Sequence, residues 1–458
     1  MSMMKGYSLY VGLLLFLMIH EISCKAPLRK VSVEKRVHEQ YIVVLKDDAD
    51  MDDIGASFQD SVKWGTPEGN ILHQYRHTIN GFSAQLSKDS VQKLLESDIV
   101  EYIEEDQIGY TLQVSSPVPG LSRVDQRNLP VDEQQLDYLG DGSNVHIYII
   151  DTGVQYSHTE FTGRTGEGVD LIGDPPQVGV DCFGHGTHIA GTAAGSTYGV
   201  AKNATIHSVR IIGCVDGYTN AVFIAAMDWV AANAIRPAVA SMSVGLSFSQ
   251  AQNDAVQKLI STGITVSTSG GNENKDACER SPASAPDAIT VGAIDMEDNK
   301  SPFSNFGRCI DIFAPGSDIL SATLDNATDT LSGTSMACPH VSGAAAILLG
   351  INGSLKPRDV KDQLLRGATM NKVTNARFLS PNRILYIGKD TCMVRCGYPV
   401  DVNRNCQCDS QCSDRGDCCT DYPYLCWENG TSYSHPLNKS PIFTMCGNLI
   451  KIYQRGIF

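Results

Sequence analysis

The segment VHIYIID, residues 145–151, is a near-continuous apolar run that ends in an acidic residue. Helical stretches at 218–234 and 252–263 separate some of the later apolar runs. Those runs are ATIHSVRII (204–212), AVASMSV (238–244), GITVSTSG (263–270) and AITVGAI (288–294). Apolar strands that alternate with helices predict an α/β fold with a parallel sheet covered on both faces. In such sheets, functional side chains gather at the carboxyl ends of the strands.

Length and charge limit the classes of protein. At 458 residues the chain is long for one domain, and 42% hydrophobic with 19% charged residues is typical of globular protein. The formal net charge of −15 argues against nucleic acid as a partner, because phosphate binding needs a basic face.

The N-terminus has the pattern of an export signal. Lys5 precedes the apolar run YSLYVGLLLFLMI at 7–19, which is shorter than the roughly 20 residues needed to span a bilayer. We therefore expect a signal peptide at 1–24, no membrane span, and a secreted, extracellular product. The N-x-S/T sequons are compatible with a glycoprotein; they are Asn203, Asn299, Asn326, Asn352, Asn429 and Asn438.

Residues 40–110 form a separate small α+β unit. QYIVVLKD, INGFSAQLS and DIVEYIEED are strand-like, and KDSVQKLLES places apolar residues on one helical face. Asp89 or Ser90 is the expected cap of that helix. The irregular stretch TLQVSSPVPG at 111–120 predicts a linker that can be cut.

Three residues match the roles of a catalytic triad. Asp151 ends its strand, His185 lies between glycines in DCFGHGTHIAGTAAG (181–195), and Ser335 lies in LSGTSMACPH (331–340). Taken singly, each is more often a turn cap, a structural histidine or a helix N-cap. Together they supply a nucleophile, a base and an orienting acid, in the chain order Asp-His-Ser.

The same chemistry needs donors for a tetrahedral oxyanion. Asn272, in STSGGNEN (267–274), follows a buried strand and two glycines. With the backbone N–H of Ser335 at a helix start, it is the expected oxyanion hole. We expect Pro339 in the first turn of that helix, where its missing N–H costs little.

These blocks resemble the subtilase family. IIDTGV, GHGTHIAG, GTSMACPH and SGGN look like its signature blocks, closest to the proteinase K-like branch, over 115–389. The upstream module, at 25–114, resembles the family's I9-type inhibitory propeptide. In the family this module assists folding, is cut off autocatalytically and leaves its tail in the active-site cleft. The resemblance sets the cut near Gln113 to Ser116.

The resemblance also implies substrate-binding residues. Backbone groups around Ser243, Val244 and Gly245 should pair with an extended substrate, with Leu246 and Gly271 beside the pockets. Leu246 stands where relatives commonly have glycine, so it should intrude on the pocket for the residue before the scissile bond. Arg280 stands where the branch often has an aromatic residue.

A calcium site and two disulfides follow from the same resemblance. The carbonyls of Pro286 and Ala288 and the Asp311 carboxylate match a structural calcium site; a plain structural role for Asp311 is the alternative. The implied disulfides join Cys182 to Cys214 and Cys278 to Cys309. Cys338 should be a free, buried thiol.

The C-terminal segment 390–427 is rich in cysteine. In a secreted protein so short a segment cannot build a normal core, so it must be held by disulfides. Zinc is a weaker alternative, and spacing does not choose among the 105 connectivities. The order of cysteines resembles the somatomedin B domain, which implies an extracellular protein partner. The eight are Cys392, Cys396, Cys406, Cys408, Cys412, Cys418, Cys419 and Cys426. Cys446 is left over in a tail at 428–458.

The sequence predicts a secreted serine endopeptidase made as a zymogen, with polypeptide substrates and its own propeptide as inhibitor. One alternative is a self-processing binding protein that keeps its propeptide and cuts nothing else; a weaker one makes the C-terminal module the effector. His73 and His77 are candidate pH sensors for propeptide release, with ordinary solvated histidines as the alternative.

Overall fold

A computed structural model describes residues 26–49, 69–111, 114–115, 120–131, 138–173, 177–215, 217–393, 396, 406–419 and 421–426. The expected signal peptide (1–24), the C-terminal tail (428–458) with Cys446, and residues 112, 113 and 116 of the expected cleavage region lie outside these residues.

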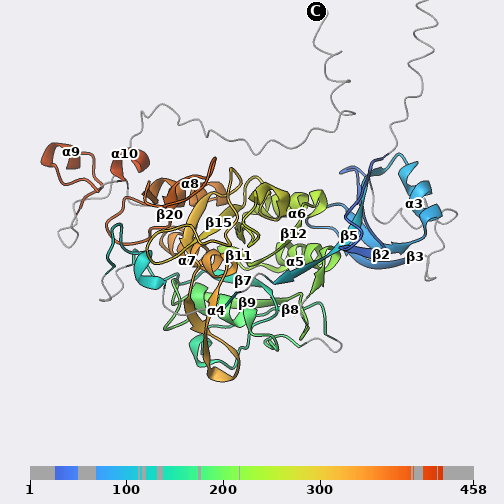
Figure 1. The fold of residues 1–458 in the computed structure, drawn as a ribbon, viewed down its shortest axis with the longest axis horizontal. Helices are drawn as coiled ribbons and strands as arrows, with labels where there is room; N and C mark the ends of the chain where they lie inside the picture. Colours follow the sequence, from blue (N-terminus) through green and yellow to red (C-terminus); the bar gives the residue numbers. More distant parts are fainter. Residues whose placement is uncertain are drawn as a thin grey trace, which may run out of the picture.

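A nine-stranded sheet forms the centre of the molecule (Figure 1). Its strands are parallel except for the pair at one edge, β19–β20. In spatial order they are β19 (Thr369–Met370), β20 (Arg383–Ile384), β16 (Ile312–Pro315), β15 (Ile289–Ile294), β13 (Thr265–Ser269), β11 (Ala238–Met242), β7 (His146–Asp151), β9 (Thr205–Arg210) and β8 (Val169–Asp170). The five apolar runs of the sequence therefore lie in this sheet, as predicted.

Alternate side chains of each strand enter two cores. Ile147 and Ile149 of β7 pack with helices α4 (His185–Ala194), α7 (Thr334–Ile351) and α8 (Pro357–Gly367). Tyr148 and Ile150 pack with α5 (Asn220–Asn233) and α6 (Gln250–Ser261) on the opposite face. Both faces are apolar, which explains why the strands read as continuous runs rather than as alternating patterns.

Helix α7 is almost entirely enclosed, with every residue from Thr334 to Leu349 buried. Among the described residues it is the one helix long and apolar enough to cross a membrane, and 89% of that stretch is buried inside the protein. Small residues allow this depth: a Cβ on Gly343 would lie 2.7 Å from the carbonyl oxygen of Ala193 in α4.

Pro339 does not lie in the first turn of α7, as the sequence analysis predicted, but inside the helix. A proline there has no N–H to give to the carbonyl of the residue four positions earlier, Ser335. The Ser243 hydroxyl donates to that carbonyl instead, at 2.9 Å. The buried acceptor is therefore satisfied, and α7 is joined to the segment after β11.

The upstream unit packs one helix on an antiparallel sheet. The helix, α3 (Lys88–Leu95), buries Val91, Leu94 and Leu95 as predicted, but its N-cap is Ser87, whose side chain accepts from Ser90 N, rather than Asp89 or Ser90. The strands are β2 (Arg36–Leu45), β3 (Gly69–Tyr75), β4 (Gly81–Leu86) and β5 (Val100–Thr111), in the order β5-β2-β4-β3.

Strand β5 extends beyond its own unit and joins the main domain (Figure 1). It pairs antiparallel with β10 (Tyr218–Thr219) and with β12 (Val244–Ser247), which in turn pairs with β14 (Arg280–Ser281). The remaining short elements are β1 (Leu28–Arg29), β6 (Val114–Ser115), β17 (Ile319–Ala322), β18 (Thr328–Ser332), α9 (Cys412–Arg415), α10 (Tyr422–Leu425) and four single 3-10 turns at 121–123, 159–161, 277–279 and 324–326.

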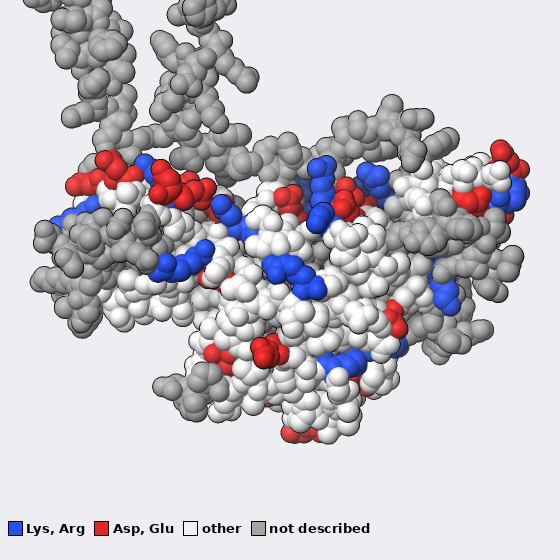
Figure 2. Space-filling view, turned by 180° about the vertical axis from the view of Figure 1, so that it is seen from behind, with Lys and Arg blue, Asp and Glu red and all other residues white. Residues whose placement is uncertain are grey.

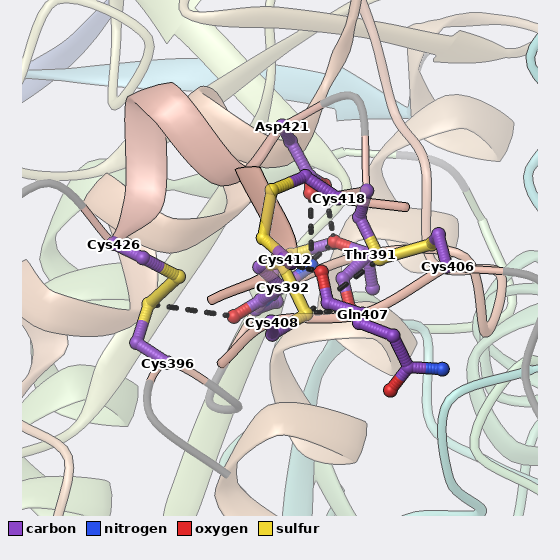
Figure 3. Close-up of a disulfide and its surroundings, with 12 residues drawn as sticks. Thr391, Cys392, Cys396, Cys406, Gln407, Cys408, Cys412, Cys418, Asp421 and Cys426 are labelled. Carbon is purple, nitrogen blue, oxygen red and sulfur yellow. Dashed lines mark hydrogen bonds between the residues drawn. A yellow bond between two sulfur atoms is a disulfide. The ribbon is translucent and has the colours of Figure 1, made fainter. Parts of the chain in front are cut away.

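The C-terminal unit is held by four disulfides (Figure 3). They join Cys392 to Cys408, Cys396 to Cys426, Cys406 to Cys419 and Cys412 to Cys418. Three of these sulfurs form the one tight group of potential metal ligands among the described residues, and each is already in a disulfide. The structure therefore favours the disulfide interpretation over zinc.

The C-terminal unit is attached to the main domain through Arg127. Its guanidinium donates to the Asp421 carboxylate at 2.9 Å and to the Gly367 carbonyl at 3.0 Å, and stacks 3.7 Å from the Tyr386 ring centre. Asp421 also accepts from the backbone N–H of Cys392 (Figure 3).

Candidate active site

Asp151 and His185 are brought together by the ends of β7 and α4. The Nδ1–Oδ1 distance is 2.7 Å, and both side chains are fully buried. Thr152 supports both: its N–H donates to Asp151 Oδ1 at 2.8 Å, and its hydroxyl accepts from Gly186 N at 2.8 Å. A carboxylate on Nδ1 places the proton there and leaves Nε2 of a neutral imidazole as the basic nitrogen.

Ser335 is the second residue of α7 and is fully buried. Its hydroxyl donates to the backbone carbonyl of Ser243 at 2.7 Å. A transfer of its proton to another base would require the hydroxyl to turn away from Ser243.

Asn272 is fixed by Thr334, the residue before Ser335. Its side-chain oxygen accepts from the Thr334 N–H at 2.9 Å and from the Thr334 hydroxyl at 2.8 Å. Its amide nitrogen is buried and has no hydrogen-bond partner among the described residues. Since a buried donor is normally paired, this amide has the hydrogen-bonding capacity that an oxyanion would satisfy.

The loop that carries Asn272 requires a glycine. Gly271 has φ +102°, and a Cβ there would lie 2.3 Å from Asn305 Nδ2. The Asn305 side chain in turn accepts from Glu273 N and Lys275 N and donates to the Gly270 carbonyl. The loop is thus held on both sides of Asn272.

The C-terminal strand of the upstream unit lies where a substrate is expected. In β5, Thr111 is opposite Val244 and Tyr110 is opposite Gly245; on the other edge, Gly109 is opposite Tyr218. Farther along the chain, Val114 is opposite Ser332, three residues before Ser335. Thr111 and Val114 therefore pair with the two segments of the main domain that are next to Ser335, one through Ser243 and one through Ser332.

The Leu246 side chain lies beside Gly109 of β5. A Cβ on Gly109 would lie 2.6 Å from Leu246 Cδ2 and 2.5 Å from the Tyr218 ring, and both side chains are buried. Arg280 donates to the Gly245 carbonyl at 3.3 Å and forms an ion pair with Glu273 at 3.2 Å. Leu246 and Arg280 both line a cavity of about 330 Å3 next to Gly245.

Two buried carboxylates of β5 cap helices of the main domain. Glu104 accepts from Gln250 N and Ala251 N at the start of α6 and from the Ser249 hydroxyl. Asp106 accepts from Ala221 N at the start of α5, at 3.1 Å. Helix N-termini favour such negative groups, so these contacts hold the upstream unit on the main domain.

Burial raises the pKa of both carboxyl groups, that of Asp106 to about 7, with backbone hydrogen bonds opposing the shift. Asp106 Oδ2 is buried without a hydrogen-bond partner among the described residues, so its charged form is costly.

Of the two proposed pH sensors, His73 lies on β3 and burial lowers its pKa. His77 is exposed, and its backbone N–H donates to Asp228 of α5 at 2.6 Å.

The cysteines of the main domain pair as the resemblance implies. Cys182 is bonded to Cys214 and Cys278 to Cys309. Cys338 is free and buried, and desolvation raises the pKa of its thiol. A thiol of this kind is inert rather than nucleophilic.

The three predicted calcium ligands do lie together, and the atom that they surround is the side-chain nitrogen of Lys361. Lys361 Nζ donates to Ala288 O at 2.7 Å, to Asp311 Oδ2 at 3.0 Å and to Pro286 O at 3.3 Å. An ammonium group occupies the position that the ion would need, so these residues do not fit calcium.

Sequence reasoning missed Thr334, Asn305 and Lys361, and the caps Glu104 and Asp106. Thr334 is adjacent to Ser335 in GTS, and this adjacency was the only available signal. The others act across 30 to 147 residues of chain, and no local pattern marks them.

Comparison with known families supports each unit. The model of the subtilase family matches residues 142–384, that of the peptidase inhibitor I9 matches 40–112, and that of the somatomedin B domain matches 390–429.

Individual proteins similar to this chain are named serine proteinases or subtilisin-like proteases. An extracellular serine proteinase from a Thermus species is 42% identical over 381 residues, covering 79% of this chain and 92% of the relative. A subtilisin-like protease from Trichophyton rubrum is 37% identical over 373 residues, covering 77% and 91%. The crystal structure of a cold-adapted subtilisin-like serine proteinase matches with a TM-score of 0.57 and 46% identity, covering 60% of this chain and 99% of that one.

Replacing Thr334 by Val should lower kcat about tenfold with little change in KM, because Asn272 loses one of the two bonds that aim its amide. Asn272→Ala should cost about a hundred- to a thousand-fold. Steady-state kinetics of Thr334→Val, of Thr334→Ser, and of the double variant that combines Thr334→Val with Asn272→Ala test this expectation. Thr334→Ser should behave like wild type, and the double variant no worse than Asn272→Ala. Fully additive losses would contradict the assignment of Thr334 as a positioning residue.

Release of the upstream unit should depend on pH through Asp106. A pKa raised to about 7 on the main domain, from about 3.9 in water, means that the complex binds the proton more tightly than the separated parts. The contribution of Asp106 to complex stability is therefore complete below about pH 4 and is lost as the pH rises through about 7.

The rate at which hydrolytic activity appears from the processed complex should accordingly be faster at pH 8 than at pH 5. Asp106→Asn should remove that part of the dependence. If the rate for Asp106→Asn depends on pH as it does in the wild type, another group controls release.

Proposed function

The chain belongs to the subtilase family and is a subtilisin-like serine endopeptidase, and from this we propose that Asp151, His185 and Ser335 form its catalytic triad. The I9 unit makes the chain a zymogen. The observation that carries the assignment is the 2.7 Å contact between the buried Asp151 and His185, together with a buried serine at the start of α7.

In the proposed reaction, Ser335 Oγ bonds to the carbonyl carbon of the substrate while His185 Nε2 takes its proton. Asp151 keeps the imidazole in the correct tautomer and stabilises its charged form. The Ser335 N–H and the Asn272 amide hold the oxygen that becomes negative. His185 then gives the proton to the leaving amine, and a water repeats the sequence on the acyl-enzyme.

Backbone pairing supports a particular self-cleavage bond. Thr111 is the last residue of β5 that pairs with β12, opposite Val244, and the carbonyl of the adjacent Ser243 contacts Ser335 Oγ. Pairing on the other side resumes at Val114. We therefore place the scissile bond between Leu112 and Gln113, at the start of the region that the sequence analysis proposed.

Mass spectrometry of freshly processed protein should find complementary ends, a propeptide ending in Leu112 and a mature chain beginning with Gln113. Ser335→Ala should remain uncut. Ends at 116 or beyond in the first product, or a Ser335→Ala protein cut at the same bond, would contradict this placement.

The same register makes Gly109 the fourth residue before the cut. Tyr218 and Leu246 leave no room there for a side chain, so substrates with glycine at this position should be preferred.

Peptides that differ only at this position should be cut in the order Gly, Ala, Val, with about tenfold lower kcat/KM for Val than for Gly. Leu246→Ala should reduce the difference, because it opens the space at Gly109. Equal kcat/KM values for all three peptides with the wild-type protein would contradict the proposed preference for glycine.

Secretion is proposed from the N-terminal apolar run and from relatives that are named extracellular. The alternative of a protein that cuts only itself is not favoured, since the matched relatives are named proteases. We further propose that the somatomedin B unit binds an extracellular protein. Figure 2 shows acidic and basic side chains interspersed on one face, with no continuous basic stripe for nucleic acid.

A further inference from the structure

The position expected to hold calcium lies between two strands and a helix. Pro286 and Ala288 lie just before β15, Asp311 lies just before β16, and Lys361 comes from α8. The Lys361 side chain crosses from the helix and ends among the three oxygen atoms. Lys361 and Asp311 are each only 8% exposed.

The three contacts satisfy the chemistry of an ammonium group. Nζ has three N–H donors and meets three acceptors, two neutral carbonyls and one carboxylate oxygen. The same Asp311 oxygen also accepts from Thr290 N at 2.9 Å, so the carboxylate is fixed from the sheet side. The oxygens are thus arranged for a cation, and the cation is part of the chain.

The charges around Asp311 also disfavour calcium at this site. Calcium takes six to eight oxygen ligands and is usually matched by several carboxylates. Here Asp311 already faces the Lys361 ammonium, and Arg383 of β20 lies close enough for Asp311 to stabilise its charge. A divalent ion in the same space would meet two cations and one carboxylate.

A second ammonium in the chain is held in a similar way. Lys300 is 6% exposed, and its Nζ donates to the carbonyls of Ser301 and Ser304 at 2.9 and 2.8 Å and to Asn274 Oδ1 at 3.2 Å. This domain therefore accommodates lysine ammonium groups among backbone oxygens at more than one position.

We propose that Lys361 is a built-in replacement for calcium, so that this site needs no metal in the wild type and accepts one when the ammonium is removed. The site then ties α8 to the sheet through the covalent chain, and chelators do not weaken it.

The test measures the thermal unfolding midpoint of the full-length chain carrying Ser335→Ala, which prevents self-digestion, in EGTA and in millimolar calcium. Lys361→Ala should lower Tm in EGTA by about 5–10 °C, because a buried carboxylate loses its partner. Calcium should restore a large part of that loss. Lys361→Met, which fills the same space without charge, is the matched control and should show no recovery beyond that of the parent protein.

Asp311→Asn in the parent background keeps the proposal testable if Lys361→Ala does not fold. Its effect on Tm should be equal in EGTA and in calcium, and equilibrium dialysis should find the same number of bound calcium ions with and without the substitution. Calcium stabilisation of the parent that disappears in Asp311→Asn would overturn the proposal. So would a Lys361→Ala protein that is destabilised equally with and without calcium.

Discussion

The enclosure of α7 is the constraint on which the rest of the structure depends. A helix buried along its length needs small residues and a partner for every backbone group, and Ser243 supplies the one that Pro339 leaves without its usual donor. The same residue, through its carbonyl, holds the hydroxyl of Ser335. The packing of one helix therefore sets the positions of Ser335, of Ser243 next to β12, and of Thr334, which holds the Asn272 side chain.

The propeptide uses the geometry of a substrate and adds anchors that a substrate lacks. Its last strand, β5, pairs with β12 before the proposed cut, and β6 pairs with β18 beyond the cut. Glu104 and Asp106 cap the helices α6 and α5. Because these anchors do not involve the bond that is cut, we expect them to persist after cleavage. We therefore expect inhibition after processing to depend on this interface, and its pH dependence to follow from the raised pKa of Asp106.

Much of the fold was predictable from sequence, because buried parallel strands leave continuous apolar runs and the triad residues lie in recognisable local blocks. Long-range contacts were not predictable in the same way. Lys361 reaches Asp311 across 50 residues. The EED acids of β5 lie in a segment that the sequence marks only as a strand, although two of them are buried as helix caps. The burial of Leu246 beside Gly109 was not predictable either, because a glycine-to-leucine difference gives the presence of a side chain and not its direction. The positions of Ser87 and Pro339 show the usual uncertainty of one turn at helix starts.

The most direct test of the central claim, that Ser335 is a nucleophile covered by the propeptide tail, is covalent labelling with a serine-directed fluorophosphonate followed by peptide mass spectrometry. The processed protein freed of its propeptide should carry one adduct, on Ser335, and should be labelled many times faster than the processed complex. His185→Ala should abolish labelling. An adduct on another residue, or equal labelling rates with and without the bound propeptide, would contradict this account.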